Sequence, residues 1–145
     1  MQLIDVYSRR QDVERFLYVL MAERLEEGDT NISHVKMPST EEHHEFIEKK
    51  HYRAWYVVAT GAGDFAGSVT MSKNNELGIV IRPSYRKRGL ATAALKEIMD
   101  RHPALPAVPA ERPGRFVANI RAGNQASIAL FEHLGANLLQ HTYTL

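Results

Sequence analysis

Two different periods of apolar residues open the chain. Residues 2–7 alternate between apolar and polar side chains, which predicts a first β-strand. Residues 12–27 place apolar side chains three and four positions apart, which predicts a helix with one apolar face, and Gly28 is expected to end it. The apolar face consists of Val13, Phe16, Leu17, Leu20, Met21 and Leu25.

A second helix and three strands are expected next. Ser39 and Glu42 have the spacing of a capping box, so the helix should run from there to about residue 50. The segments after it are rich in aromatic and β-branched residues and are separated by glycine- and asparagine-containing turns, which is typical of strands. These strands are expected at residues 54–60, 65–72 and 77–82.

The last third of the chain predicts two helices and two strands around an irregular loop. A helix should begin near Leu90, with apolar residues at helical spacing up to Met99. Four prolines within residues 103–113 indicate a surface loop. After it we expect a strand at residues 115–121, a helix at about 125–134 between Asn124 and Gly135, and a final strand at 136–143.

This order of elements predicts an α/β fold, in the α+β sense, with a central mixed β-sheet and helices on both of its faces. The 145 residues suit one domain, residues 1–145, without repeats or linkers. The composition is 44% hydrophobic and 24% charged, and the net charge is only +1, so a positive field must be local. No apolar run reaches the length of a membrane span and no signal peptide is evident, so we expect a cytoplasmic protein that does not bind membranes.

The chain has no cysteine. This excludes a disulfide framework, thiolate metal ligands and an acyl-cysteine intermediate. His43, His44 and His51 do not provide a metal site either, because His43 and His51 would be about 12 Å apart along a helix. We therefore expect no metal. Gly61-Ala62-Gly63 precedes a strand, not a helix, and is interpreted as a hairpin turn.

The most specific chemistry lies where the third of these strands ends. Ile79-Val80-Ile81 leads through a basic turn, Arg86-Lys87-Arg88-Gly89, directly into a helix that begins Leu90-Ala91-Thr92. The start of a helix leaves backbone N–H groups without partners and carries partial positive charge, which favours phosphate groups. Gly89 lets the backbone approach a ligand closely because it has no Cβ. The segment therefore predicts a pyrophosphate cradle.

Two motifs here resemble those of a known family. Arg86-x-x-Gly89-x-Ala91 after a strand is similar to the acyl-CoA signature of the GNAT superfamily of N-acetyltransferases, Arg/Gln-x-x-Gly-x-Gly/Ala. Residues 117–136 resemble the family's later motif, which is a strand, then Asn-x-x-Ser/Ala, then an aromatic residue and Leu-Gly at a helix end. The two motifs occur in the family's order, and the expected elements match over most of the chain.

The resemblance implies acetyl-CoA as cosubstrate and a site for each of its parts. The strand edge at Ile79, Val80 and Ile81 would bind the pantetheine arm, in a gap between that strand and the one after the long helix. The pyrophosphate would lie on Arg86, Lys87, Arg88, Gly89, Leu90, Ala91 and Thr92. Asn124 would contact the arm. The reaction implied is direct attack of a primary amine, on a small molecule or a peptide, upon the thioester.

The proton carriers are less well defined. Some relatives have an acidic residue where this chain has Asn119, and a tyrosine where it has Phe131, and neither residue can exchange a proton. Glu76 is then the best candidate base, directly or through water, and the candidate acids are Tyr143, Ser127 and Tyr85 in falling order. A free backbone N–H near residue 81 would stabilise the oxyanion.

Alternatives remain open at this point. Loss of the acidic and tyrosine positions keeps a non-catalytic acyl-CoA sensor or scaffold as the second hypothesis. Nucleic-acid binding through the basic turn is disfavoured because no aromatic platform accompanies it. Residues 39–44 faintly resemble the amino-sugar branch of the superfamily, while polyamines, protein α-amines and aminoglycosides also stay open. Acyl groups longer than acetyl and a homodimeric assembly are open too.

Overall fold

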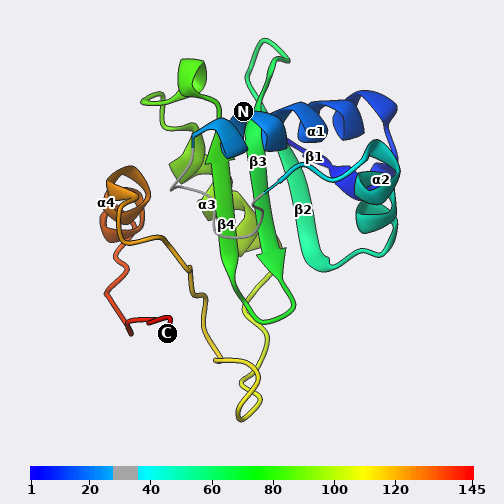
Figure 1. Cartoon of the computed structure of the whole chain (residues 1–145). Helices are drawn as coiled ribbons and strands as arrows, with labels where there is room; N and C mark the ends of the chain where they lie inside the picture. The colour runs from blue at the N-terminus through cyan, green and yellow to red at the C-terminus, as the bar shows by residue number, and fades with distance from the viewer. Residues whose placement is uncertain (28–35) are drawn as a thin grey trace.

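The computed structural model describes residues 1–27 and 36–145, so the expected helix end at Gly28 lies outside the described residues. The elements follow the predicted order up to the helix that begins at Leu90 (Figure 1). They are β1 (Gln2–Asp5), a 3₁₀ turn (Val6–Ser8), α1 (Gln11–Glu26), α2 (Thr40–Glu48), β2 (Tyr52–Ala59), β3 (Phe65–Ser72), β4 (Leu77–Ile81), a second 3₁₀ turn (Pro83–Tyr85), α3 (Leu90–Arg101) and α4 (Gln125–His133).

The strands form one four-stranded sheet in the order β1-β2-β3-β4, and all three strand pairs are antiparallel. In the sheet, β4 is an edge strand. The register of β2 on β3 shifts between Tyr52 and Ala54, which marks a β-bulge at Arg53. A bulge changes which face the side chains before it occupy.

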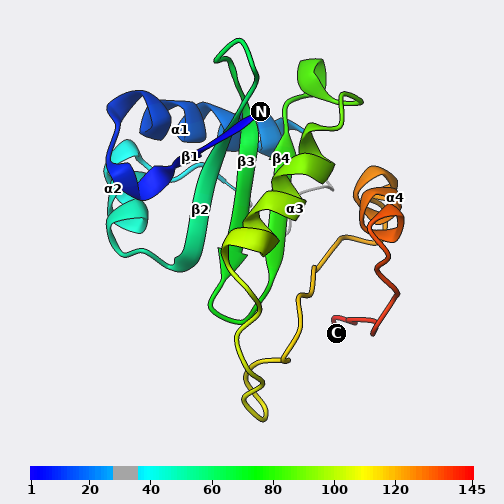
Figure 2. The ribbon, with the colours of Figure 1, turned by 180° about the vertical axis from the view of Figure 1, so that it is seen from behind.

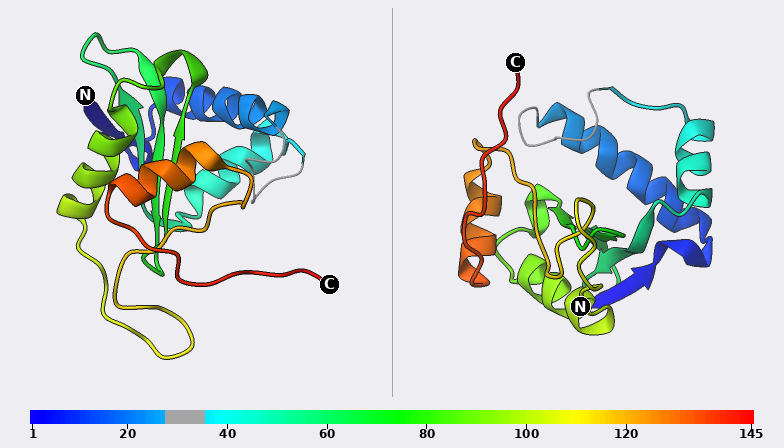
Figure 3. Two further views of the ribbon diagram at one scale, coloured as in Figure 1. Left: turned by 90° about the vertical axis from the view of Figure 1, so that its left-hand side faces the viewer. Right: turned by 90° about the horizontal axis from the view of Figure 1, so that it is seen from below.

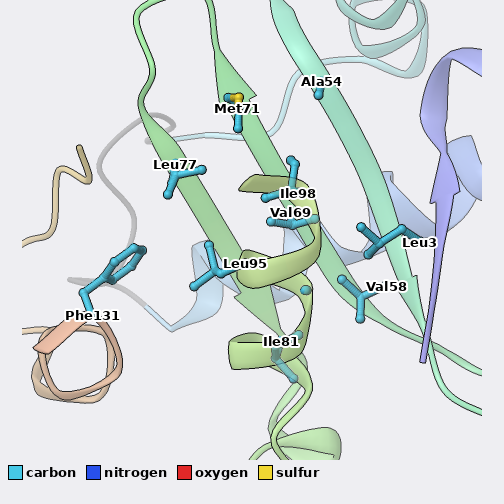
Figure 4. Packing of buried hydrophobic residues seen from close by; sticks show 11 residues of the cluster. Leu3, Ala54, Val58, Val69, Met71, Leu77, Ile81, Leu95, Ile98 and Phe131 are labelled. Carbon is cyan, nitrogen blue, oxygen red and sulfur yellow. The ribbon is translucent and has the colours of Figure 1, made fainter. Parts of the chain in front are cut away.

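Helices cover both faces of the sheet, as expected (Figures 1 and 2). On one face, α1 and α2 enclose a core that includes Val13, Leu17, Ile47, Trp55 and Val57. The capping box at the start of α2 is present. On the other face, α3 packs through Ala94, Leu95 and Ile98 on residues of all four strands (Figure 4). Phe131 of α4 joins this second core at its edge.

The expected strand at residues 115–121 does not form as a strand. One parallel bridge joins Glu76 and Val117, with a hydrogen bond from Leu77 N–H to Val117 C=O (2.7 Å) and one from Val117 N–H to Asn75 C=O (3.0 Å). From Ala118 onwards the segment leaves β4. The parallel part of the expected mixed sheet is therefore limited to this bridge.

The expected final strand at residues 136–143 is also absent. After Gly135, which has φ +93°, the chain runs away from α4 and pairs with no strand of the described sheet (Figure 3). Leu138 and Leu139 are both exposed. All residues from 136 to 145 are exposed, so the segment gains no burial of apolar side chains on the sheet.

Asn75 fixes the proline-rich loop to the hairpin between β3 and β4. It is fully buried, has φ +65°, and its side chain donates to the C=O groups of Leu105 (2.9 Å) and Pro113 (2.7 Å) and accepts from Leu105 N–H (2.8 Å). The loop thus leads residue 117 back to the beginning of β4. None of the helices in the described ranges combines the length and apolar character needed to cross a membrane.

Candidate active site

A cavity of about 410 Å³ lies between α1, the sheet and the segment that leads into α4. The α1 side contributes Leu17, Leu20, Met21 and Arg24, and the sheet contributes residues of β2, β3 and β4. The third side consists of Ala118, Asn119, Ile120, Arg121, Asn124, Ser127 and Phe131. The cavity therefore brings β4, the strand that leads to the first motif, together with residues of the second motif, which are far apart from it along the chain.

The cavity exists because β4 and the following segment separate. Arg82 N–H bonds Ala66 C=O and Ser72 N–H bonds Glu76 C=O, so the even-numbered residues of β4 pair with β3. In an antiparallel ladder the residues between them turn their N–H and C=O groups outward. The outward N–H of Leu77 donates to Val117 C=O. For the outward N–H groups of Ile79 and Ile81, no hydrogen-bond acceptor is found within the described residues. An open strand edge results.

The open edge leads to the start of α3. Gly89 is the N-cap of α3, with φ +77° and no side-chain cap. Among the described residues, the backbone N–H groups from Lys87 to Thr92 have no hydrogen-bond acceptor, and the first helical bond of α3 is from Ala93 N–H to Gly89 C=O (3.0 Å). A Cβ built on Gly89 would meet no atom within 4 Å, so the space beside Gly89 is open. This geometry fits a pyrophosphate group.

The arginines of this turn have different partners. Arg86 donates through Nε to Ile81 C=O (2.8 Å) and pairs with Glu27 (3.0 Å), while Arg82 forms a two-bond pair with Glu23 (2.8 and 3.1 Å). Both carboxylates belong to the end of α1. In the part of the chain that the structure describes, no carboxylate pairs with Lys87 or Arg88. Arg88 donates to Ser84 C=O (3.1 Å), and Arg86 holds the turn on α1.

Hydroxyl groups line the floor of the cavity. Ser68, Thr70 and Ser72 project from alternate positions of β3, on the face that carries α1. Ser68 Oγ accepts from Trp55 Nε1 (2.8 Å), and Ser72 Oγ accepts from the backbone N–H groups of Asn74 and Glu76 (3.1 Å each). Opposite Thr70 stands Gly78, where a Cβ would lie 2.5 Å from Thr70 Oγ1. A larger residue at position 78 would therefore force the Thr70 side chain to move.

Aromatic rings form the wall beside the floor. Tyr52 meets Trp55 edge to face at 5.1 Å between ring centroids and Phe46 at 5.9 Å, and Trp55 also meets Tyr7 at 6.4 Å. Tyr52 and Trp55 both line the cavity. Burial raises the pKa of Tyr52, and the nearby carboxylate of Glu76 raises it further, since both disfavour the phenolate.

Most residues expected in the catalytic region do lie at this cavity. Glu76, Ser127 and Asn124 line it, and Asn124 accepts the N–H of Ser127 (3.2 Å) as the cap of α4. Phe131 occupies the wall with an apolar ring. Tyr143 was wrongly expected nearby, because it is 85% exposed on the unpaired C-terminal segment and is not part of the cavity lining.

Other aromatic residues behave differently from one another. Tyr85 is also absent from the lining and lies under the guanidinium of Arg88, 5.4 Å from its ring centroid. Trp55 and Tyr56 are adjacent in β2 and point to opposite faces: Trp55 lines the cavity, and Tyr56 packs on the α3 side, where its hydroxyl is 2.8 Å from His102 Nε2. Tyr52 was missed because the sequence places the strand start at residue 54 and does not reveal the bulge.

Within the described ranges there is no group of three or more His, Cys, Asp or Glu side chains placed to hold a metal ion. Of the three histidines considered from the sequence, His43 is buried beside Tyr18, at 5.4 Å between ring centroids, His44 pairs with Glu14 (2.7 Å) and His51 stacks on Phe46 (4.8 Å). These contacts assign them to helix packing.

Comparison with known proteins decides the family. The family model described as acetyltransferase (GNAT) domain matches residues 3–137, which is nearly the whole chain and includes both motifs. The chain belongs to the GNAT acetyltransferase family. Its reaction is therefore acyl-CoA-dependent N-acyl transfer, with acetyl-CoA as the cosubstrate typical of GNAT proteins. No curated protein sequence matches this GNAT chain significantly.

Solved structures share the fold at low sequence identity. An N-acetyltransferase from Staphylococcus aureus superposes with a TM-score of 0.70 at 18% identity, over 92% of this chain and 81% of that one. Spermidine N-acetyltransferase from Vibrio cholerae, solved with CoA and spermine, gives 0.69 at 16% identity over 92% and 79%. A Salmonella typhimurium protein solved with its cofactor acetyl-CoA gives 0.68 at 18% identity over 93% and 78%.

Proposed function

We propose that this GNAT protein transfers an acetyl group from acetyl-CoA directly to a primary amine of a small molecule or peptide. The observation that carries the proposal is the open edge of β4, which connects the unpaired N–H groups at the start of α3 with the cavity around Glu76. A ligand with a pyrophosphate at one end, amides along its length and a reactive group at the other end would match all three parts.

Each part has a chemical role in this proposal. The N–H groups from Lys87 to Thr92, with Lys87 and Arg88, hold the pyrophosphate. The outward N–H and C=O groups of Ile79 pair with the amides of the arm. The oxyanion would be stabilised by the backbone N–H of Ile81 or Ile79. Both N–H groups point outward from the sheet, so neither needs to reorganise before it can donate.

The acceptor amine would lie near Glu76. An ammonium group has no lone pair, so it must lose a proton before it attacks the thioester, and Glu76 is the carboxylate that lines the described cavity. The rings of Tyr52 and Trp55 beside it would hold the amine and the methylene groups that bear it, through cation–π and apolar contacts. The chain has no cysteine, so direct attack needs no acyl-enzyme.

Two measurements test the proposal. Saturating acetyl-CoA, at about 100 times its Kd, should stabilise the fold by about 2.7 kcal/mol and raise Tm by about 5–10 °C. The single tryptophan, Trp55, lies in the cavity wall, so its fluorescence should also report acetyl-CoA binding without any turnover.

Thiol release should then be followed over a panel of amines, with spermidine, spermine, amino sugars and peptides with free N-termini. Acetyl transfer to at least one class is expected, with the acetylated amine confirmed by mass. A protein that binds acetyl-CoA and transfers to none of these classes would support the sensor hypothesis. If acetyl-CoA changes neither the Tm nor the Trp55 fluorescence, the proposed pyrophosphate cradle is refuted.

A further inference from the structure

Tyr52 reaches the cavity because of the β-bulge in β2. Before the bulge, Tyr52 lies opposite Ser72 of β3, and after it Trp55 lies opposite Thr70. Without the extra residue, side chains three positions apart would lie on opposite faces. With it, Tyr52 and Trp55 share the face that carries the cavity, and Arg53 turns to the other side, where it donates to Pro103 C=O (2.8 Å).

The same register places Tyr52 in line with Glu76. Tyr52 lies opposite Ser72, and Ser72 N–H bonds Glu76 C=O, so the three residues form one row from β2 across β3 to the residue before β4. Residues directly opposite one another point to the same face. Two strand spacings separate the ends of the row, about 10 Å between Cα atoms. The small side chain of Ser72 leaves the space between them open.

Within the described part of the chain, each end of this row carries a polar group without a hydrogen-bond partner. Among the described residues, neither the Tyr52 hydroxyl nor the Glu76 carboxylate forms a hydrogen bond or ion pair, although both line the cavity. The Tyr7 and Tyr18 hydroxyls, in contrast, donate to backbone C=O groups, and that of Tyr56 meets His102. The ring of Tyr52 is fixed by Trp55 and Phe46, so its hydroxyl is held in place.

We propose that Tyr52 is a catalytic residue, the general acid that protonates the leaving sulfur, and that it works together with Glu76. The proposal rests on the proposed function. Tyr52 would supply the acidic hydroxyl that Phe131 lacks and that Tyr143 cannot supply, because Tyr143 does not line the cavity. The bulge at Arg53 is the feature that turns the Tyr52 side chain of β2 toward the cavity.

The protons balance as follows. Glu76 takes one proton from the ammonium, and the free amine attacks the thioester carbon to form a C–N bond. When the C–S bond breaks, sulfur keeps the electron pair and takes the proton of the Tyr52 hydroxyl. The Tyr52 phenolate then takes the proton that Glu76 holds, which restores both groups. The remaining extra proton on nitrogen passes to water.

The test is Tyr52→Phe, with Tyr56→Phe as a matched control. Both variants remove one hydroxyl from β2 and keep the ring, but Tyr56 lies on the opposite face of the sheet. We expect Tyr52→Phe to lower kcat by about a hundredfold or more while the KM for acetyl-CoA stays within about twofold. Tyr56→Phe should keep the wild-type kcat even if its Tm falls.

A pH profile separates chemistry from structure. In the wild type, kcat should fall at alkaline pH as the acid ionises, and Tyr52→Phe should lack this fall. Replacing Tyr52 with 3-fluorotyrosine, which keeps its shape but is more acidic, should move the fall to lower pH. A wild-type kcat and alkaline profile in Tyr52→Phe, or an unmoved profile with 3-fluorotyrosine, would overturn the proposal. A wild type that acetylates no amine would instead show that the proposed function fails.

Discussion

Gly89→Ala probes the cradle because one added methyl group has two separate effects there. The first acts on the fold. Gly89 has φ +77°, and an L-residue in this conformation costs about 1–2 kcal/mol. Since the new Cβ touches nothing within 4 Å, no steric clash is added in the free protein. The Tm should therefore fall by about 2–8 °C.

The second effect acts on the ligand. The methyl group would occupy the open space in front of the N–H groups at the start of α3, where the pyrophosphate is proposed to lie. Displacing one hydrogen bond to a charged group costs about 1.5–3 kcal/mol, which weakens acetyl-CoA binding by about 10- to 150-fold. The Kd is measured from Trp55 fluorescence, together with Tm by thermal unfolding.

Gly63→Ala provides the matched control. Gly63 has φ +91° in the hairpin between β2 and β3, and a Cβ there also meets nothing within 4 Å. Its backbone cost should be similar, but its Kd for acetyl-CoA should equal that of the wild type. If Gly89→Ala and Gly63→Ala bind acetyl-CoA equally well, the helix start does not hold the pyrophosphate and the reasoning is refuted.

Three further perturbations test other parts of the structure. Glu76→Gln should lower the rate at neutral pH by about ten- to a thousandfold, with a deficit that shrinks as pH rises; an unaltered pH–rate profile would remove Glu76 as the base. Asn75→Ala, which loses three buried hydrogen bonds, should lower the free energy of unfolding by about 2–4 kcal/mol in urea titrations, and a loss below about 1 kcal/mol would contradict its anchoring role. Burial and then the charges of Arg53 and Arg101 lower the pKa of His102, so as pH drops the unfolded chain takes up a proton before the folded one does. The free energy of unfolding should therefore fall as pH drops below about 6.5, and His102→Gln should weaken this fall. An identical pH dependence in both proteins would exclude His102 as its cause.

Local chemistry explains why the strand, turn and helix of the proposed cradle were predictable. A strand, a proline, a basic turn with Gly89 and an amphipathic helix are consecutive in the sequence, and each depends only on its neighbours. The structure adds that Arg86 pairs with Glu27, a contact 59 residues apart that no local pattern contains. The sequence therefore suggested Arg86 as a phosphate ligand where the structure gives it a second role.

The errors have a common physical origin in strand pairing. A bulge is a property of two strands together, so the shift that brings Tyr52 to the cavity could not be seen in β2 alone. Residues 115–121 and 136–143 were expected as strands, but of these residues only Val117 forms a bridge, next to the start of β4. Whether a segment joins a sheet depends on the edge it meets, and beyond Leu77 that edge is left open.

Helix α1 has a consequence for how the two substrates influence each other. One of its sides forms the cavity wall through Leu20 and Arg24, and its final turns hold the cradle through the pairs of Glu23 with Arg82 and Glu27 with Arg86. Because these four residues of α1 lie within its last two turns, they move together. If bound phosphate draws Arg86 from Glu27, the cavity wall around the amine shifts too, and acetyl-CoA then changes the affinity for the amine. Thermodynamic reciprocity requires the amine to change the affinity for acetyl-CoA by the same factor.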